Sequence, residues 1–158
     1  MHAPADDVRL KRLEQLSYFL DNSLRVPGTG YRIGYDALIG LVPGIGDLLG
    51  AVLSVYIVLE AARFRLPFST VLRMALNVGL EVLVGTVPLL GDVFDAAWKA
   101  NARNVALLRE RLAAGDAEAA RKDRLLVGAV AFGLVLLVVG LGAGVVLLLR
   151  GLAGLIGF

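Results

Sequence analysis

The chain lacks cysteine altogether and has a single histidine, His2, among its 158 residues. Without cysteine it can form no disulfide framework, no cysteine-ligated metal site and no thiol nucleophile. A Ser-His-Asp triad or a multi-histidine metal site needs an imidazole held in place by the fold, and His2 stands at the very start of the chain. The sequence therefore predicts neither site, and it indicates no cofactor.

Charged residues are also scarce. They make up 19% of the chain and hydrophobic residues 58%, against roughly 25% and 45–50% in ordinary soluble domains. The formal net charge is only +2, and no dense Lys/Arg run is interleaved with aromatic residues, so nucleic acid is not an expected partner. The mean hydropathy of +0.76 makes the lipid bilayer the first partner to expect.

The most informative feature that is present is a motif that occurs twice, 45 residues apart. The copies are Asp36-Ala-Leu-Ile-Gly40-Leu-Val-Pro43-Gly44-Ile-Gly46-Asp47 and Glu81-Val-Leu-Val-Gly85-Thr-Val-Pro88-Leu-Leu-Gly91-Asp92. In each, Pro-x-x-Gly-Asp interrupts an apolar stretch, and proline and glycine both disfavour an uninterrupted helix. Each copy therefore predicts a helix, a break and a second helix. The break residues are Gly40, Pro43, Gly44 and Gly46 in the first copy and Gly85, Pro88 and Gly91 in the second.

The expected fold class is all-α: an integral membrane helical protein with this tandem helix-break-helix repeat and a C-terminal transmembrane helix. An amphipathic helix is predicted over 1–24, where no signal peptide is expected because no continuous apolar run occurs. It would lie in the membrane interface, cover the bundle or, with least support, bind a partner. The other segments are a duplicated membrane domain over 25–112, with repeats at about 31–62 and 76–107, a charged linker over 113–124, and a transmembrane helix with a short tail over 125–158.

The last apolar segment, residues 125–149, contains no charge and is long enough to cross a bilayer. Gly140 and Gly144 have the small-xxx-small spacing that allows two helices to approach closely. We expect these two glycines to pack against another helix, within the chain or in a homo-oligomer.

Acids in an apolar region need a role, because an isolated ionised carboxylate in hydrocarbon costs about 3 kcal/mol or more. Asp47 and Asp92 each follow a break and precede an apolar run, so the first interpretation is a helix N-cap, with the first capped helix starting at Leu48. A cation or proton site is the alternative, and the identity of a metal is not predicted. Asp36 and Glu81 come eleven residues earlier and would form salt bridges or join such a site.

Two topologies stay open at this point. If each repeat is one broken span, the copies have opposite orientation, as in many secondary transporters, and Asp47 and Asp92 meet near the midplane. If each repeat is a helical hairpin, both copies have the same orientation and both breaks lie at hairpin tips. The arginines of the 62–73 connector favour the hairpin by the positive-inside rule, whereas Lys99 favours the broken span.

Further motifs accompany the repeat: Arg25-x-Pro27-Gly28-Thr29-Gly30, Arg73-Met74-x-x-Asn77, Phe94-Asp95 and Lys99-x-Asn101-x-x-Asn104. Together with the two Pro-x-x-Gly-Asp copies, they make the chain resemble a bacterial membrane family catalogued as domain of unknown function 4112. The likeness covers about residues 15–110 and leaves the last apolar segment outside. The resemblance implies an integral or membrane-associated bacterial protein and supplies no activity.

We therefore expect a multi-pass protein of the bacterial cytoplasmic (inner) membrane, with its N-terminus in the cytoplasm. The predicted function is an oligomeric channel or transporter for an ion or small solute that uses the acids at the broken helices. The alternative is a structural or scaffolding membrane protein that binds a protein partner or anionic lipid. An enzyme is not expected, because paired acids alone are weak evidence for acid-base catalysis.

Overall fold

The computed structural model describes residues 4–40, 45–85, 94, 97–114 and 124–156. The helical fold class is confirmed in this part of the chain. The helices are α1 (Pro4–Asn22), α2 (Tyr35–Gly40), α3 (Ile45–Ala62), α4 (Phe68–Gly85), α6 (Ala100–Ala114) and α7 (Arg124–Ile156), and two short strands, β1 (Leu24–Arg25) and β2 (Arg32–Ile33), pair antiparallel.

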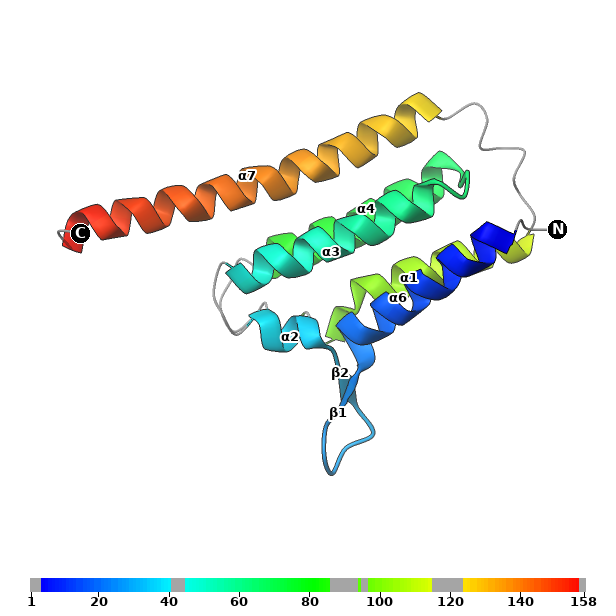
Figure 1. Cartoon of the computed structure of the whole chain (residues 1–158), viewed down its shortest axis with the longest axis horizontal. Helices are drawn as coiled ribbons and strands as arrows, with labels where there is room; N and C mark the ends of the chain where they lie inside the picture. The colour runs from blue at the N-terminus through cyan, green and yellow to red at the C-terminus, as the bar shows by residue number, and fades with distance from the viewer. Residues whose placement is uncertain (1–3, 41–44, 86–93, 95–96, 115–123, 157–158) are drawn as a thin grey trace.

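The long helices lie roughly alongside one another in three layers (Figure 1). The first layer is α1 with α6, the second is α3 with α4, and the third is α7, which contacts both α3 and α4. The hydrophobic core lies where these layers meet, because apolar residues at helical spacing point inward from each helix. Its fully buried large side chains are Leu13, Leu20, Ile57, Val58, Val71, Met74, Val78 and Leu108.

A small hairpin connects the first two helices, where the sequence predicts only a turn. The strands pair Leu24 with Ile33, and Gly28 occupies the left-handed region with φ of 77°. Gly34 follows the hairpin and passes against the end of α1: a Cβ atom there would lie 1.2 Å from the carbonyl oxygen of Leu20. Only glycine therefore allows the chain to leave the hairpin at this point.

At both predicted breaks, the flanking helices pack beside each other. α2 contacts α3, and α4 contacts α6. Because α3 and α4 form a hairpin joined by 63–67, the end of α4 and the start of α3 lie at the same end of the bundle, where α2 ends and α6 begins (Figure 1). This packing of the flanking helices is what the hairpin topology predicts, and the orientation of the two repeats in a membrane stays a prediction. Gly40 ends α2, Gly85 ends α4, and Gly46 is buried in the first turn of α3; Pro43, Gly44, Pro88 and Gly91 lie outside the described residues.

Within the described residues, two helical segments, Phe68–Gly85 and Leu125–Leu148, are long and apolar enough to cross a membrane. The candidate span agrees with the uncharged segment predicted over 125–149, and α7 continues beyond it through Arg150 and Gly151 to Ile156. A single arginine does not stop a helix, and one interior glycine costs only about 1 kcal/mol.

Gly140 and Gly144 were predicted to pack against another helix, but within the described residues neither lies against one. Both are exposed, and an added Cβ at either position would meet nothing within 4 Å. The glycine of α7 that lies against a neighbour is Gly142, where an added Cβ would stand 3.3 Å from Leu48 Cδ2. Packing of Gly140 and Gly144 between chains stays a prediction.

Candidate functional site

The acids predicted from the repeat lie in different helices. Asp36 is in the first turn of α2, and Asp47 is the third residue of α3, because this helix starts at Ile45 rather than Leu48. Glu81 lies in α4, where its Oε2 accepts a hydrogen bond of 3.2 Å from the Ser54 hydroxyl of α3. Asp92 lies outside the described residues.

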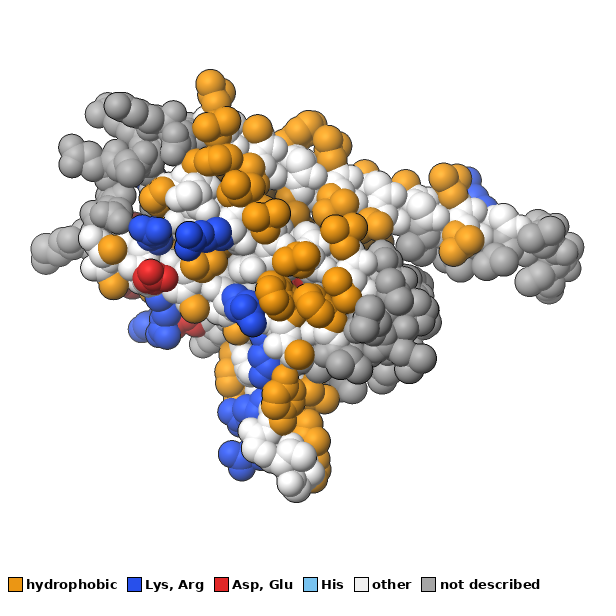
Figure 2. Space-filling model, turned by 180° about the vertical axis from the view of Figure 1, so that it is seen from behind, with side chains coloured by type: hydrophobic (Ala, Val, Ile, Leu, Met, Phe, Trp, Pro, Cys, Tyr) orange, Lys and Arg blue, Asp and Glu red, His pale blue; other side chains and the backbone are white. Residues whose placement is uncertain are grey.

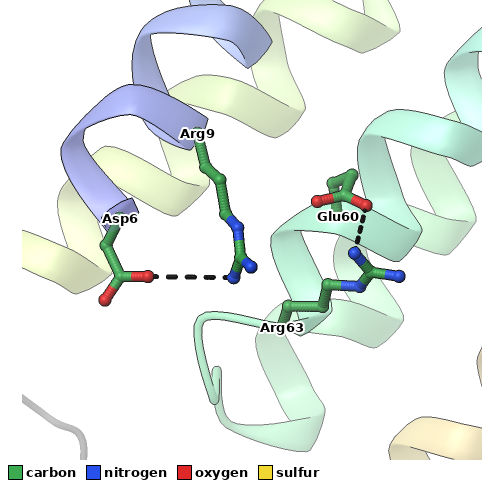
Figure 3. Close-up of polar contacts among 4 residues, drawn as sticks. All are labelled: Asp6, Arg9, Glu60 and Arg63. Atoms are coloured by element: carbon green, nitrogen blue, oxygen red, sulfur yellow. Dashed lines mark ion pairs between the residues drawn. The ribbon is translucent and has the colours of Figure 1, made fainter. Parts of the chain in front are cut away.

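Within the described ranges, no group of three or more His, Cys, Asp or Glu side chains is placed to hold a metal ion. Two ion pairs lie close together in another part of the bundle. Asp6 with Arg9 (3.9 Å) and Glu60 with Arg63 (2.8 Å) are neighbours at one end of the bundle, at the start of α1 and the end of α3 (Figure 3).

The buried carboxylate of Asp21, at the end of α1, forms hydrogen bonds with the start of α6. Asp21 is 2% exposed, and it accepts hydrogen bonds from the Ala102 backbone N–H (2.7 Å) and from Asn101 Nδ2 (2.8 Å). Next to it, Lys99 Nζ donates to the side-chain oxygen of Asn22 at 2.7 Å. The end of α1 thus supplies the acceptor that the free N–H groups of α6 require.

Burial raises the pKa of Asp21 above its ordinary value of 3.8. Its hydrogen bonds with Ala102 and Asn101 and the charge of Lys99 act in the opposite direction, but their effect is smaller than that of desolvation. The carboxyl therefore holds its proton more strongly in the folded protein than in an unfolded chain.

A second polar network joins α6 to α4. Trp98 Nε1 donates to the backbone oxygen of Asn77 (3.3 Å), Asn77 Nδ2 donates to Asn104 Oδ1 (2.8 Å), and Asn104 Nδ2 donates to the backbone oxygen of Met74 (3.2 Å). Asn104 is fully buried. Because a buried amide must find partners, this network fixes the position of α6 on α4.

A groove of about 460 Å³ lies between α4 and α6 beside this network, lined by Arg73, Leu76, Asn77, Arg103, Ala106, Leu107 and Glu110. Arg103 is held in place by Trp98. Its Nε donates to the Trp98 backbone oxygen at 2.6 Å, and its Cζ lies 4.1 Å from the centroid of a Trp98 ring. The groove therefore has one guanidinium whose position is set by the fold.

Two further cations lie over aromatic rings near the β1–β2 hairpin. Arg32 Cζ is 5.6 Å from the Tyr18 ring centroid, and Lys99 Nζ is 4.8 Å from that of Tyr31. Tyr and Trp rings paired with Lys and Arg are typical of side chains at a membrane-water interface.

The two polar networks were not predicted as a site from the sequence. Asn77, Asn101 and Asn104 are noted there only as residues of the motifs. Asparagine is neutral or unfavourable in a helix interior, so two of them three residues apart on one helix face were the signal that could have identified a buried network.

Comparison with curated proteins gave no match, and comparison with solved structures gave none either. A family model matches residues 9–112. This range includes the groove, both polar networks and the two Pro-x-x-Gly-Asp motifs, and it excludes α7. Because the match covers more than half of the chain and agrees with the resemblance of its motifs, the protein belongs to the family described as Domain of unknown function (DUF4112).

Proposed function

We propose that the protein is a structural membrane protein of the bacterial cytoplasmic membrane. In this proposal α7 and the α3–α4 layer lie in the bilayer, and the α1–α6 layer lies at the cytoplasmic surface and contacts anionic lipid. The observation that carries it is the change in exposed side chains from one layer to the next.

The α7 side of the bundle exposes mainly hydrophobic side chains. Leu125 is 90% exposed, and only 12% of the most apolar window of α7 is buried. In Figure 2, hydrophobic side chains gather over α7 and the neighbouring layer. Exposed apolar surface of this extent marks a membrane or protein contact rather than an ordinary soluble surface. The exposed large hydrophobic residues of α7 are Leu125, Leu126, Phe132, Leu136, Val139, Val146, Leu147 and Leu148.

The α1–α6 layer exposes charge instead. Most Lys and Arg side chains on the face seen in Figure 2 lie away from α7. The exposed charged residues of α1 and α6 include Asp7, Arg9, Lys11, Arg12, Arg103, Arg109 and Glu110. Arg109 Nε also pairs with Glu14 across the two helices at 2.6 Å. A fixed layer with basic side chains suits the anionic surface of a cytoplasmic leaflet.

The absence of native cysteine provides the test. Single variants Gln15→Cys in α1 and Leu136→Cys in α7 are both at exposed positions. In inverted membrane vesicles, whose cytoplasmic face is outward, we expect a membrane-impermeant maleimide to label Gln15→Cys and to leave Leu136→Cys unlabelled, while both label fully after solubilisation in denaturing detergent. Equal labelling of the two variants in membranes, or release of the protein by alkaline carbonate, contradicts the proposal.

Transport of an ion or small solute is the second candidate, and one contact favours it. Glu81 places a carboxylate in the contact between α3 and α4, within a helix long and apolar enough to cross a membrane. An acid in such a helix is a functional candidate by default. Proteoliposomes should then show cation or proton flux that falls in Glu81→Gln and in Asp47→Asn, with Asp7→Asn as the control. Flux that is no higher than in empty liposomes rules this candidate out.

A further inference from the structure

We propose that the groove between α4 and α6 binds the phosphate of one anionic phospholipid through Arg73 and Arg103. The inference deepens the proposed function, on which it rests for access to lipid, and it assigns a specific site. Basic pockets between helices near a membrane surface are suited to such headgroups.

The two arginines have donors available. In the described part of the chain, Arg73 forms no hydrogen bond or ion pair. Arg103 uses Nε for the Trp98 carbonyl, which leaves both terminal Nη groups for a ligand. Glu110 also lines the groove, so two positive charges and one negative charge give it a net positive charge. A phosphate with guanidinium donors forms the stronger, charge-assisted class of hydrogen bond.

The floor of the groove is fixed before any ligand arrives. Trp98, which holds Arg103, is itself tied to the Asn77 backbone, and the Asn77 side chain is tied to buried Asn104. The ligand therefore meets a guanidinium that has already lost most of its freedom, which reduces the entropic cost of binding.

The surface next to the groove favours a lipid over a free phosphate ion. Leu76 lines the groove, and Leu80 and Leu83 continue from it along α4 at i, i+4 and i+7, so the three lie on one helix face. They are 56%, 43% and 59% exposed. An acyl chain lying along this stripe would cover it, whereas inorganic phosphate would leave it in water.

The test uses the full chain purified in a mild neutral detergent, with bound lipid counted by native mass spectrometry. The probes are dioleoyl phosphatidylglycerol, dioleoyl phosphatidylcholine and inorganic phosphate. We expect one phosphatidylglycerol to bind in preference to phosphatidylcholine, and the double variant Arg73→Gln/Arg103→Gln to weaken its binding about tenfold or more. The matched control is Arg25→Gln/Arg65→Gln, which removes the same charge from exposed positions outside α1, α6 and the groove and should leave binding unchanged.

Three results would overturn the assignment: equal phosphatidylglycerol binding by the groove variant, an equal loss in the control variant, or displacement of the lipid by millimolar inorganic phosphate. The last result would indicate a free-anion site. If Arg103→Gln fails to fold because its contact with Trp98 is lost, Arg73→Gln alone provides the test. Failure of the proposed function is separate, because the maleimide experiment measures insertion and this one measures lipid binding in detergent.

Discussion

The helices α6 and α7 are held to the same bundle in opposite ways. α6 is fixed by directed polar contacts: the Asp21 carboxylate at its start, the Asn77–Asn104 amide pair along its length and the Glu14–Arg109 ion pair across to α1. α7 packs through apolar side chains such as Leu134 and Val138 and leaves most of its surface outside the bundle. The position of α6 is therefore specified by the protein itself, whereas the position of α7 depends more on what surrounds the bundle.

This difference has a physical origin. A buried hydrogen-bonding group tolerates few positions of its partner, because an unmade bond in a dry interior costs about 1–3 kcal/mol. Apolar contacts are not directional, so they fix a helix less sharply. Substitutions should therefore act strongly and locally on the α1–α6 layer and weakly on α7.

The largest effect is expected from Gly34→Ala, which disrupts the close contact between residue 34 and the backbone at the end of α1. The new Cβ would lie 1.2 Å from the Leu20 carbonyl oxygen, and backbone atoms move less easily than a side-chain end. We expect a loss of about 3 kcal/mol or more in the free energy of unfolding. Thermal unfolding in detergent, followed by circular dichroism, measures it. Gly30→Ala is the control, since nothing lies within 4 Å of its added Cβ; equal effects would contradict the clash.

The next effect is expected from Asp21→Ala. It leaves the Ala102 N–H and Asn101 Nδ2 without their acceptor, so a loss of about 2 kcal/mol is expected. Asp21→Asn retains one acceptor oxygen and should lose less. Asp7→Ala, at an exposed position of the same helix, serves as the control in the same melting experiment. A stability equal to wild type in Asp21→Ala would show that the polar contact does not hold α6.

A smaller effect concerns pH. The pKa of Asp21 is raised above 3.8 by burial, so the folded protein binds more protons than the unfolded chain between 3.8 and the folded-state pKa. Stability from this group is therefore fully present at low pH and falls as pH rises through that window. The stability difference between wild type and Asp21→Asn should change in this direction in a pH series of melting curves. A difference that grows in favour of wild type with rising pH would contradict the direction.

The helices and the apolar C-terminal segment could be predicted because each depends on local sequence. Apolar spacing gives the helix, and a long uncharged run gives the span. The start of α3 at Ile45 was misplaced because helix ends depend on weak local preferences that neighbouring turns override.

The site could not be predicted in the same way, because its parts come from distant segments. Asp21 reaches the start of α6 across about 80 residues of sequence, and Asn77 meets Asn104 across 27. No local pattern states which helices will pack together. The acids at the breaks could be predicted as candidate site residues from their residue type. The asparagines and Trp98 acquire their roles only through tertiary contact.

The smallest effect is expected on α7, from Gly140→Ala and Gly144→Ala. An added Cβ meets nothing within 4 Å at either position, and alanine favours a helix over glycine by about 1 kcal/mol, so the stability of the single chain should hold or rise slightly. Gly142→Ala is the internal comparison, because its Cβ would approach Leu48 at 3.3 Å and cancel part of that gain. Analytical ultracentrifugation of Gly140→Leu/Gly144→Leu in detergent then tests packing between chains. If this variant has a smaller assembly than wild type, these glycines form a contact between copies of the chain, and the position of α7 is specified by a partner molecule after all.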